Sequence, residues 1–410
     1  MTRTYIGDYP STPFPVTDIP ASCVHEVFRN VEQWERETDT RAIRLHVGEP
    51  AFRPSSAVAG AVAAAVRDGR DSYTTAEGVL ELREAVVEKL TSENGHDTDV
   101  ELVVATPGSA QGLLAVMNAL HRPGAHLLLP AVHWPVHLQQ CLLAGFVPRF
   151  YPMDEQMRPD VAAIAAMDVD SSAVLLVNTP SNPAGALCDT ARLGELVALA
   201  RERNWAVISD EAYEDFAFDG EHVSTAALES DVPPSDRVVF SAFSFSKSYA
   251  MTGYRLGYVV APNSRHAQTL RTVQEASIVC PALPVQMAGI AALEEREQSR
   301  RNGAFVRRTR DSALLPLLDA GLLERLPGGG WYALLDCGRT GLDATTFAAR
   351  LLREHGVALA PASGFALRVA PDSAIEPDPG AEHLLRLAFC GPPELVAEGA
   401  RRTAAFAGAR

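Results

Sequence analysis

Short apolar segments alternate with helical segments between residues 100 and 262, and this alternation constrains the fold more than any other feature. The apolar segments are continuous and have helical segments between them. Strands with this pattern are buried on both faces, because helices cover both sides of a largely parallel sheet. We therefore expect an α/β fold with strands at Leu102–Ala105, His126–Leu129, Val147–Tyr151, Ala173–Val177, Ala206–Ser209, Val238–Ser241 and Leu256–Val260.

The C-terminal region has a different pattern. Strands are expected at Trp331–Asp336, Val357–Ala360 and Leu384–Phe389, and helices at about 343–355 and 394–406. This mixture predicts a smaller α+β domain, which the N-terminal segment joins. We therefore expect an N-terminal arm and helix (1–49), a large domain (50–295) and a small domain (296–410).

The segments beside the central strands also carry regular patterns. A short strand is expected at Ile43–Val47, and long helices are expected at 264–279 and 283–320. In the helix expected over 79–92, Lys89 stands among glutamates, so we expect it on a solvent-exposed face.

Charge and cysteine pattern exclude several classes of protein. The formal net charge is -15, which argues against nucleic acid or an anionic membrane as a partner. The six cysteines lack CxxC spacing, so neither a metal site nor a disulfide framework is expected. The first residues lack an apolar signal core and no run of 18 apolar residues occurs, so we expect a cytoplasmic location.

The stretch from Ser241 to Tyr258 holds Lys247, one of only two lysines in the chain. A lysine amine that loses its proton can form a Schiff base, whereas a guanidinium stays protonated. Ser244 precedes Lys247 and Arg255 follows it, an arrangement that suits a phosphate next to an imine. This layout favours a pyridoxal phosphate (PLP) site. The alternative is a surface lysine in a serine-rich loop.

Polar and aromatic residues follow several predicted strands, at the edge where open α/β sheets bind ligands. Gly108 and Ser109 open a helix after a strand, which predicts an anion site, although an ordinary strand–turn–helix fits equally well. Trp134 also follows a strand, and its ring suits either stacking on a planar cofactor or packing in the core.

Two further strand ends carry groups suited to a pyridine ring. Asn182 lies in a loop stiffened by prolines, where its amide can donate to a ring oxygen. Asp210 ends an apolar strand and can keep a pyridinium nitrogen protonated, while Tyr213 can donate to the phenolate oxygen. The alternative for Asp210 and Tyr213 is a helix N-cap with a packed tyrosine.

Arg386 stands inside an apolar strand of the small domain, where an unpaired guanidinium would be costly. A substrate carboxylate is one partner that it can have. A buried aspartate or glutamate is the alternative.

The order and spacing of three motifs is specific. Asn-Pro-Ala-Gly (182–185), Asp-Glu-Ala-Tyr (210–213) and Ser-Phe-Ser-Lys (244–247) with Gly-Tyr-Arg-Leu-Gly (253–257) together resemble the fold-type I PLP-dependent aminotransferases of class I/II, the aspartate aminotransferase superfamily. The resemblance extends from Gly48 to the last helix. It implies a three-layer PLP-transferase fold, in which a large, mainly parallel sheet domain is joined to a smaller α+β domain. It also implies pyridoxal 5′-phosphate as the cofactor.

The resemblance also implies roles for single residues. Lys247 matches the lysine of the internal aldimine, and Asp210 matches the partner of the pyridine nitrogen. Tyr213 and Asn182 match the pair on the ring hydroxyl, and Trp134 matches the stacking aromatic residue.

The phosphate and substrate positions follow in the same way. The phosphate cup is matched by Ser244, Arg255, Gly108, Ser109 and Ala110. Tyr73 matches a tyrosine that reaches the phosphate from the second subunit of a homodimer. Arg386 matches the arginine that grips the substrate α-carboxylate, with Gly48 and Asn182 beside it.

We therefore expect a PLP-dependent aminotransferase that acts on an α-amino acid through a Lys247 aldimine and a quinonoid intermediate. The alternative is a lyase or synthase that diverts the quinonoid to elimination, replacement or C–C bond formation, as in relatives resembling 1-aminocyclopropane-carboxylate synthase. Two departures from the family pattern support that alternative: His137 stands where many relatives carry tyrosine, and the loop between Phe365 and Arg386 is long. No second arginine can be assigned to a side-chain carboxylate, so the amino donor and acceptor stay open.

Overall fold

The computed structural model describes residues 19–169, 172–370 and 375–408. The expected N-terminal arm lies largely outside the described residues, as does part of the long loop after Phe365.

A seven-stranded sheet forms the centre of the larger part of the molecule, with strand order β2-β8-β7-β6-β5-β3-β4. Only β8 is antiparallel to its neighbours, and the other pairs are parallel. The strands are β2 (Val103–Thr106), β3 (His126–Pro130), β4 (Val147–Tyr151), β5 (Val174–Asn178), β6 (Ala206–Asp210), β7 (Val239–Ser244) and β8 (Gly257–Val260). The expected strands therefore form, with ends shifted by a few residues.

Both faces of this sheet are buried, which explains the continuous apolar pattern of the strands. In β5, Val174 and Leu176 belong to one hydrophobic core, whereas Leu175 and Val177 belong to the core on the opposite face. Successive side chains of a strand point to opposite faces, so a strand between two cores must be apolar throughout.

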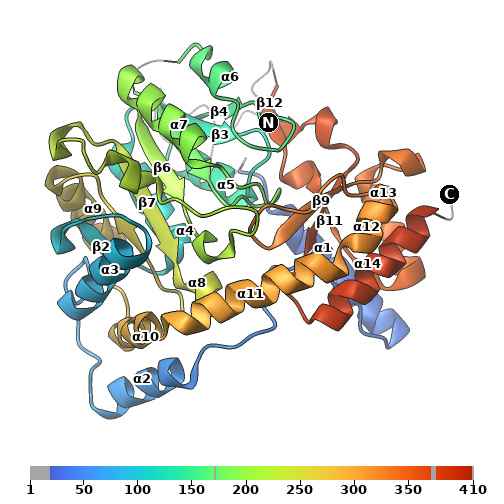
Figure 1. Cartoon of the computed structure of the whole chain (residues 1–410), viewed down its shortest axis with the longest axis horizontal. Coiled ribbons are helices and arrows are strands. Elements are labelled where there is room, and N and C mark those ends of the chain that lie inside the picture. The colour runs from blue at the N-terminus through green and yellow to red at the C-terminus, as the bar shows by residue number, and fades with distance from the viewer. Residues whose placement is uncertain (1–18, 170–171, 371–374, 409–410) are drawn as a thin grey trace, which may run out of the picture.

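Helices cover the sheet and connect it to the C-terminal part (Figure 1). The helix α11 runs from α10, beside the large sheet, to α12 and α14 near the small one. The helices are α1 (Cys23–Thr38), α2 (Ser56–Arg67), α3 (Leu80–Glu93), α4 (Gly108–Leu120), α5 (Pro135–Leu143), α6 (Val161–Ala165), α7 (Thr190–Arg203), α8 (Phe245–Ser248), α9 (Ser264–Ile278), α10 (Leu283–Glu294), α11 (Arg296–Ala313), α12 (Leu315–Asp319), α13 (Ala344–His355) and α14 (Pro393–Gly408).

Local chemistry fixes where several helices begin and end. The side chain of Asp189 accepts a hydrogen bond from the amide of Arg192 at the start of α7. Asp343 caps α13 in the same way. At their C-terminal ends, Asn204 and Gly356 take left-handed backbone conformations, which asparagine and glycine adopt most readily.

The C-terminal part is built on a smaller antiparallel sheet of order β11-β14-β9. Its strands are β9 (Tyr332–Asp336), β11 (Ala360–Pro361) and β14 (Leu384–Ala388). Beside it, β1 (Ile43–Arg44) pairs with β10 (Val357–Ala358), so the N-terminal segment joins this part. A hairpin of β12 (Leu367–Val369) and β13 (Ile375–Pro377) lies in the long loop and packs near β4. The expected α/β fold with a large and a small sheet is confirmed.

Three local predictions were wrong in extent. The strand expected at Val357–Ala360 is two strands, β10 and β11, which belong to different sheets. The strand expected at Ile43–Val47 is only two residues long, because its partner β10 is equally short. The helix expected over 283–320 is three helices, which are interrupted at Glu295 and Leu314.

The predicted exposure of Lys89 was also wrong. Its side chain is only 2% exposed and forms an ion pair with Glu214. The glutamates of α3 suggested a solvated face, but the partner of Lys89 lies 125 residues away in the sequence. No helix in the described ranges has the length and apolar character that crossing a bilayer requires.

Candidate active site

A cavity of about 220 Å³ opens where the carboxyl ends of β5, β6 and β7 meet the start of α4. It is lined by Ser109, Ala110, Trp134, Asn178, Asn182, Asp210, Ala212, Tyr213, Ser244, Ser246, Lys247, Thr252, Arg255 and Tyr332. The structure thus gathers most of the cofactor-binding residues expected from the sequence around one cavity. Of the others, Gly108 lies beneath Arg255 at its edge, and Tyr73 does not line it.

One end of the cavity is suited to an anion. The helix α4 begins at Gly108, and no side chain caps its first amides, so Ser109 and Ala110 present free N–H groups and the positive end of the helix dipole. Arg255 crosses this end and donates from Nη1 to Ser246 Oγ (3.3 Å) and to the carbonyl of Thr252 (2.8 Å).

The backbone at this end is packed too tightly for side chains. Gly108 has φ +79°, and a Cβ there would lie 2.6 Å from Nη2 of Arg255. A Cβ on Gly257 would lie 2.5 Å from the amide nitrogen of Ser109. Both positions therefore require glycine if α4 is to begin close to β8 and Arg255.

Lys247 lies in the short helix α8, which follows β7 directly. Its Nζ sits 4.8 Å from the centre of the Trp331 ring and 5.7 Å from that of Tyr213. Within the described chain it forms no ion pair with a carboxylate. Its contacts are thus aromatic faces, which attract an ammonium without neutralising it.

Asp210 is buried at the end of β6 and lines the cavity. Its Oδ2 lies 2.9 Å from Nε2 of His137, which is fully buried in α5. The backbone carbonyl of Asp210 accepts from Nδ2 of Asn178 at the end of β5 (3.0 Å). These contacts hold the carboxylate at the sheet edge.

Tyr213 follows Asp210 and lies deep in the protein. Burial raises the pKa of Tyr213 well above its usual value, and the neighbouring Tyr332 adds to the rise. Its hydroxyl therefore keeps its proton across the physiological pH range and is available as a hydrogen-bond donor.

Arg386 is only 3% exposed and lies behind Asn182 and Tyr332. It donates from Nη1 to Oδ1 of Asn182 (3.1 Å) and from Nη2 to the carbonyl of His46 (2.8 Å). The rings of Tyr332 and Phe365 each lie 4.3 Å from its guanidinium carbon. Among the residues described, no carboxylate pairs with it, and its Nε has no partner. The described part of the chain therefore does not supply the buried aspartate or glutamate considered as the alternative.

Two expected residues, Gly48 and Tyr73, do not line the cavity. Gly48 packs against the hydroxyl of Tyr332, which would be 1.9 Å from a Cβ on residue 48, so a larger residue does not fit. Tyr73 is 87% exposed and is not part of the cavity wall of this chain.

Several residues of the site were not predicted from the sequence. Tyr332 begins β9 of the small sheet and Trp331 directly precedes it, so nothing in the sequence of the large domain points to them. Ser246 and Thr252 stand in the Lys247 stretch but carry no distinguishing motif. The sequence marks His137 only as a departure from the family pattern, because its contact with Asp210 spans 73 positions of sequence.

Known proteins resemble this chain along most of its length. The family model for aminotransferase class I and II matches residues 40–402. Aspartate/prephenate aminotransferase of Thermus thermophilus is 33% identical over 334 residues, which are 79% of this chain and 84% of that protein. Aromatic-amino-acid aminotransferase 2 of Thermococcus litoralis is 30% identical over 333 residues, with the same coverage of 79% and 84%. Among solved structures, a single mutant of Thermus thermophilus aspartate aminotransferase superposes with a TM-score of 0.85 at 28% identity, covering 95% of this chain and 98% of that one.

Proposed function

The chain belongs to the class I and II aminotransferases, and from this premise we propose that it moves the amino group of an α-amino acid with pyridoxal 5′-phosphate bound in the cavity at Lys247. When bound, this cofactor supplies an aldehyde for the amino group and a ring that accepts electrons. The residues around the cavity determine how the cofactor and the substrate would be held.

The α4 end of the cavity supports binding of the phosphate. Free amides of Ser109 and Ala110, the hydroxyl of Ser244 and the guanidinium of Arg255 converge there. Gly108 and Gly257 leave a hollow in the backbone that a Cβ would fill. A dianionic group suits this donor set, because the guanidinium is cationic and the two amides lie at the positive end of a helix.

The middle of the cavity supports binding of the pyridine ring. Trp134 lines one wall and offers a flat surface for stacking. Asp210 is suited to the ring nitrogen, where its negative charge favours the protonated form. Tyr213 and Asn182 are suited to the ring hydroxyl, since both have groups able to donate there.

Lys247 is the residue that we assign to proton transfer. Its amine would hold the cofactor and, when free, would take the proton from the substrate Cα as a general base. The aromatic rings of Trp331 and Tyr213 keep the chain of Lys247 inside the site.

Arg386 is the observation that carries the proposal for the substrate. Its guanidinium is buried between two rings, keeps an unpaired Nε, and pairs with no carboxylate of the described residues. A buried guanidinium without a counter-ion is costly, so an anionic ligand is expected beside it. The α-carboxylate of an amino acid, held by Arg386 and Asn182 near Gly48, would supply that charge.

Two finer points belong to the same proposal. We assign Tyr73, whose ring is exposed on this chain, to the phosphate site of a second copy, which makes the active unit a homodimer. The relatives named above are aminotransferases of aspartate, prephenate or aromatic amino acids by name. Among the described residues, the cations that line the cavity are Lys247 and Arg255, and both are assigned to the cofactor, so neither is left for a side-chain carboxylate of the substrate.

The variant Lys247→Ala tests the function. The purified variant should lose the visible absorbance of the bound cofactor and should not turn over, whereas a coloured, active variant would refute the role of Lys247. Product analysis of the unmodified enzyme tests the reaction type. A keto acid formed together with the aminated cofactor supports transamination, and elimination or replacement products without it would support the lyase alternative.

A further inference from the structure

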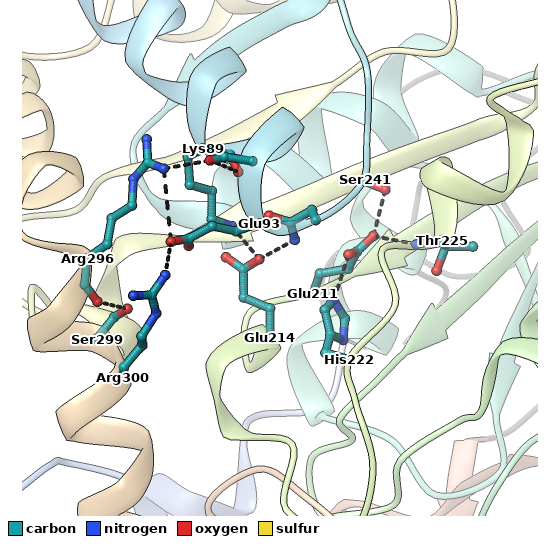
Figure 2. A network of polar contacts seen from close by, with 12 residues as sticks. Lys89, Glu93, Glu211, Glu214, His222, Thr225, Ser241, Arg296, Ser299 and Arg300 are labelled. Atoms are coloured by element: carbon teal, nitrogen blue, oxygen red, sulfur yellow. Dashed lines mark hydrogen bonds and ion pairs between the residues drawn. The ribbon is translucent and has the colours of Figure 1, made fainter.

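Lys89, the only lysine besides Lys247, is buried and pairs with Glu214, the residue after Tyr213, in a network of polar contacts (Figure 2). Its Nζ pairs with Oε2 of Glu214, and the same oxygen accepts from Nδ2 of Asn94 at 2.7 Å. The ammonium is thus enclosed by α3, the residue that ends it, and the turn after β6.

The segment from Asp210 to Glu214 has two chemically different sides. Asp210 and Tyr213 face the cavity. Glu211 and Glu214 do not line it: Glu211 is fully buried, the Glu214 side chain is only 9% exposed, and both enter other polar contacts (Figure 2). Oε1 of Glu211 accepts from Ser241 Oγ of β7 at 2.6 Å, and Glu214 is held from α3 by Lys89. Asp210 and Tyr213 are therefore each followed in the chain by a glutamate, and each glutamate is held by a residue of another element.

Lys89 also touches the strand that leads to Lys247. Its Nζ lies 5.0 Å from the centre of the Phe243 ring, which is in β7, four residues before Lys247. One ammonium therefore contacts both segments of the site: the turn after β6 through Glu214, and the end of β7 through Phe243.

We propose that Lys89 is a positioning residue, which sets the place of the Lys247 amine relative to Asp210 and Tyr213 by holding Glu214 and Phe243 together. This inference rests on the proposed role of Lys247, although it concerns the protein without cofactor as well. A shift of the turn or of the strand would displace the amine from the atoms on which it acts.

A role in stability alone explains the network less well. Buried ion pairs contribute little net stability, and replacing both partners by apolar residues is often neutral or stabilising. The neighbouring Asp215 adds a third carboxyl group, whose buried Oδ2 has no hydrogen-bond partner among the described residues. Burial and the charge of Glu214 raise the pKa of Asp215, whereas Lys89 lowers it. A polar cluster that begins one residue after Tyr213 is therefore better explained by a role in positioning the residues of the site.

The presence of only two lysines makes a direct test possible. Apoprotein labelled with 13C at lysine Cε should give two side-chain signals, and Lys89→Met leaves one, which assigns Lys247. The pH midpoint of the Lys247 signal should move by about half a unit or more in Lys89→Met and in Glu214→Gln, because the charges and dipoles around an amine set its pKa. In the cofactor-bound variants, kcat should fall about tenfold with a smaller change in KM, since a small misplacement of a catalytic group strongly lowers the rate of the chemical step.

Two further variants separate positioning from stability. Arg310→Met removes another buried cation, whose Nη1 lies 2.8 Å from Oδ1 of Asp219. Neither Arg310 nor Asp219 lines the cavity that holds Lys247, so this variant should lower Tm without moving the Lys247 midpoint. Lys89→Met/Glu214→Leu removes both charges of the pair. It should recover Tm but keep the displaced midpoint, and it carries the test if Lys89→Met does not fold.

The proposal would be overturned if Lys89→Met, Glu214→Gln and the double variant all kept the wild-type Lys247 midpoint and kcat. The ion pair would then serve stability alone. A failure of the proposed function would look different. In that case Lys247→Ala would keep the visible absorbance, whereas the apoprotein midpoints would still report whether Lys89 places the Lys247 amine.

Discussion

Arg386 has two properties that a lysine lacks. Its guanidinium is flat, so it fits between the rings of Tyr332 and Phe365, and it can present two parallel donors to one carboxylate. Arg386→Lys keeps the charge but loses both features. We expect KM for the amino donor to rise roughly 10- to 100-fold, the scale of one or two lost hydrogen bonds to a charged group, with Tm nearly unchanged. Steady-state kinetics with varied amino donor measure this.

Arg368→Lys is the matched control for that substitution. Arg368 is exposed on the β12–β13 hairpin and pairs with Glu376, so its replacement should leave KM unaltered. An unchanged KM in Arg386→Lys would mean that the substrate carboxylate binds elsewhere.

At this scale, the sequence identifies residues whose role is set by their neighbours in the chain. Ser244, Lys247 and Arg255 were found together because they share one stretch of sequence. Lys89 was misplaced and the contact of His137 was missed for the opposite reason. Their partners, Glu214 and Asp210, lie far away in the sequence, and only the packing of α3 and α5 on the sheet brings each pair together.

At the scale of elements, the buried strands were predictable because burial on both faces imposes continuous apolar runs. The position of the site followed, since polar residues such as Asp210 stand where these runs end. Helix boundaries were harder to predict. The break at Leu314 lies just before Pro316, whereas the break at Glu295 has no proline or glycine beside it and depends on how α10 and α11 pack.

The contact between β8 and the start of α4 carries an element-scale prediction. Gly257→Ala would place a Cβ 2.5 Å from the amide nitrogen of Ser109 and 2.6 Å from the carbonyl of Phe243, both backbone atoms. The strand and the helix must then separate, which moves the amides of the anion site. We expect the affinity for PLP to fall about tenfold or more, since overpacking of this kind typically costs 1–3 kcal/mol. Titration of the apoprotein with PLP measures it.

Gly253→Ala is the control for this prediction. It lies in the same segment, and a Cβ there meets no atom within 4 Å. Its affinity for PLP should equal that of the wild type. Equal affinities for Gly257→Ala and Gly253→Ala would show that the α4 amides do not hold the phosphate.

At the scale of the whole molecule, the site depends on both sheets. Tyr213 and Phe216 share one hydrophobic core with Trp331 and Tyr332 of the small sheet. The helix α11 adds a direct link, because Asn302 donates to the carbonyl of Ser248 at 2.8 Å, next to Lys247. The sequence indicated two sheets but not that they share a core at the active site. The domain boundaries placed after residues 49 and 295 stay predictions.

Buried neutral histidines give the folded molecule a pH dependence of known sign. Burial lowers the pKa of His46 to about 4 and that of His133 to about 3, from an ordinary value of 6.5. The unfolded chain therefore binds these protons first, so the free energy of unfolding falls as pH drops below about 6.5. The raised pKa values of Asp215 and Glu229 act in the opposite direction, because their folded forms take up protons first.

Comparing variants isolates the contribution of one histidine from these opposing groups. For His46, the loss between pH 7 and pH 5 should be about 2 kcal/mol, as one pKa unit corresponds to about 1.4 kcal/mol. Denaturant unfolding at both pH values should therefore show a smaller loss in His46→Gln than in the wild type. His25→Gln changes an exposed histidine of α1 and should keep the wild-type dependence. Identical losses in all three proteins would mean that His46 takes up its proton without unfolding, and its burial against Phe28 would then not oppose the charge.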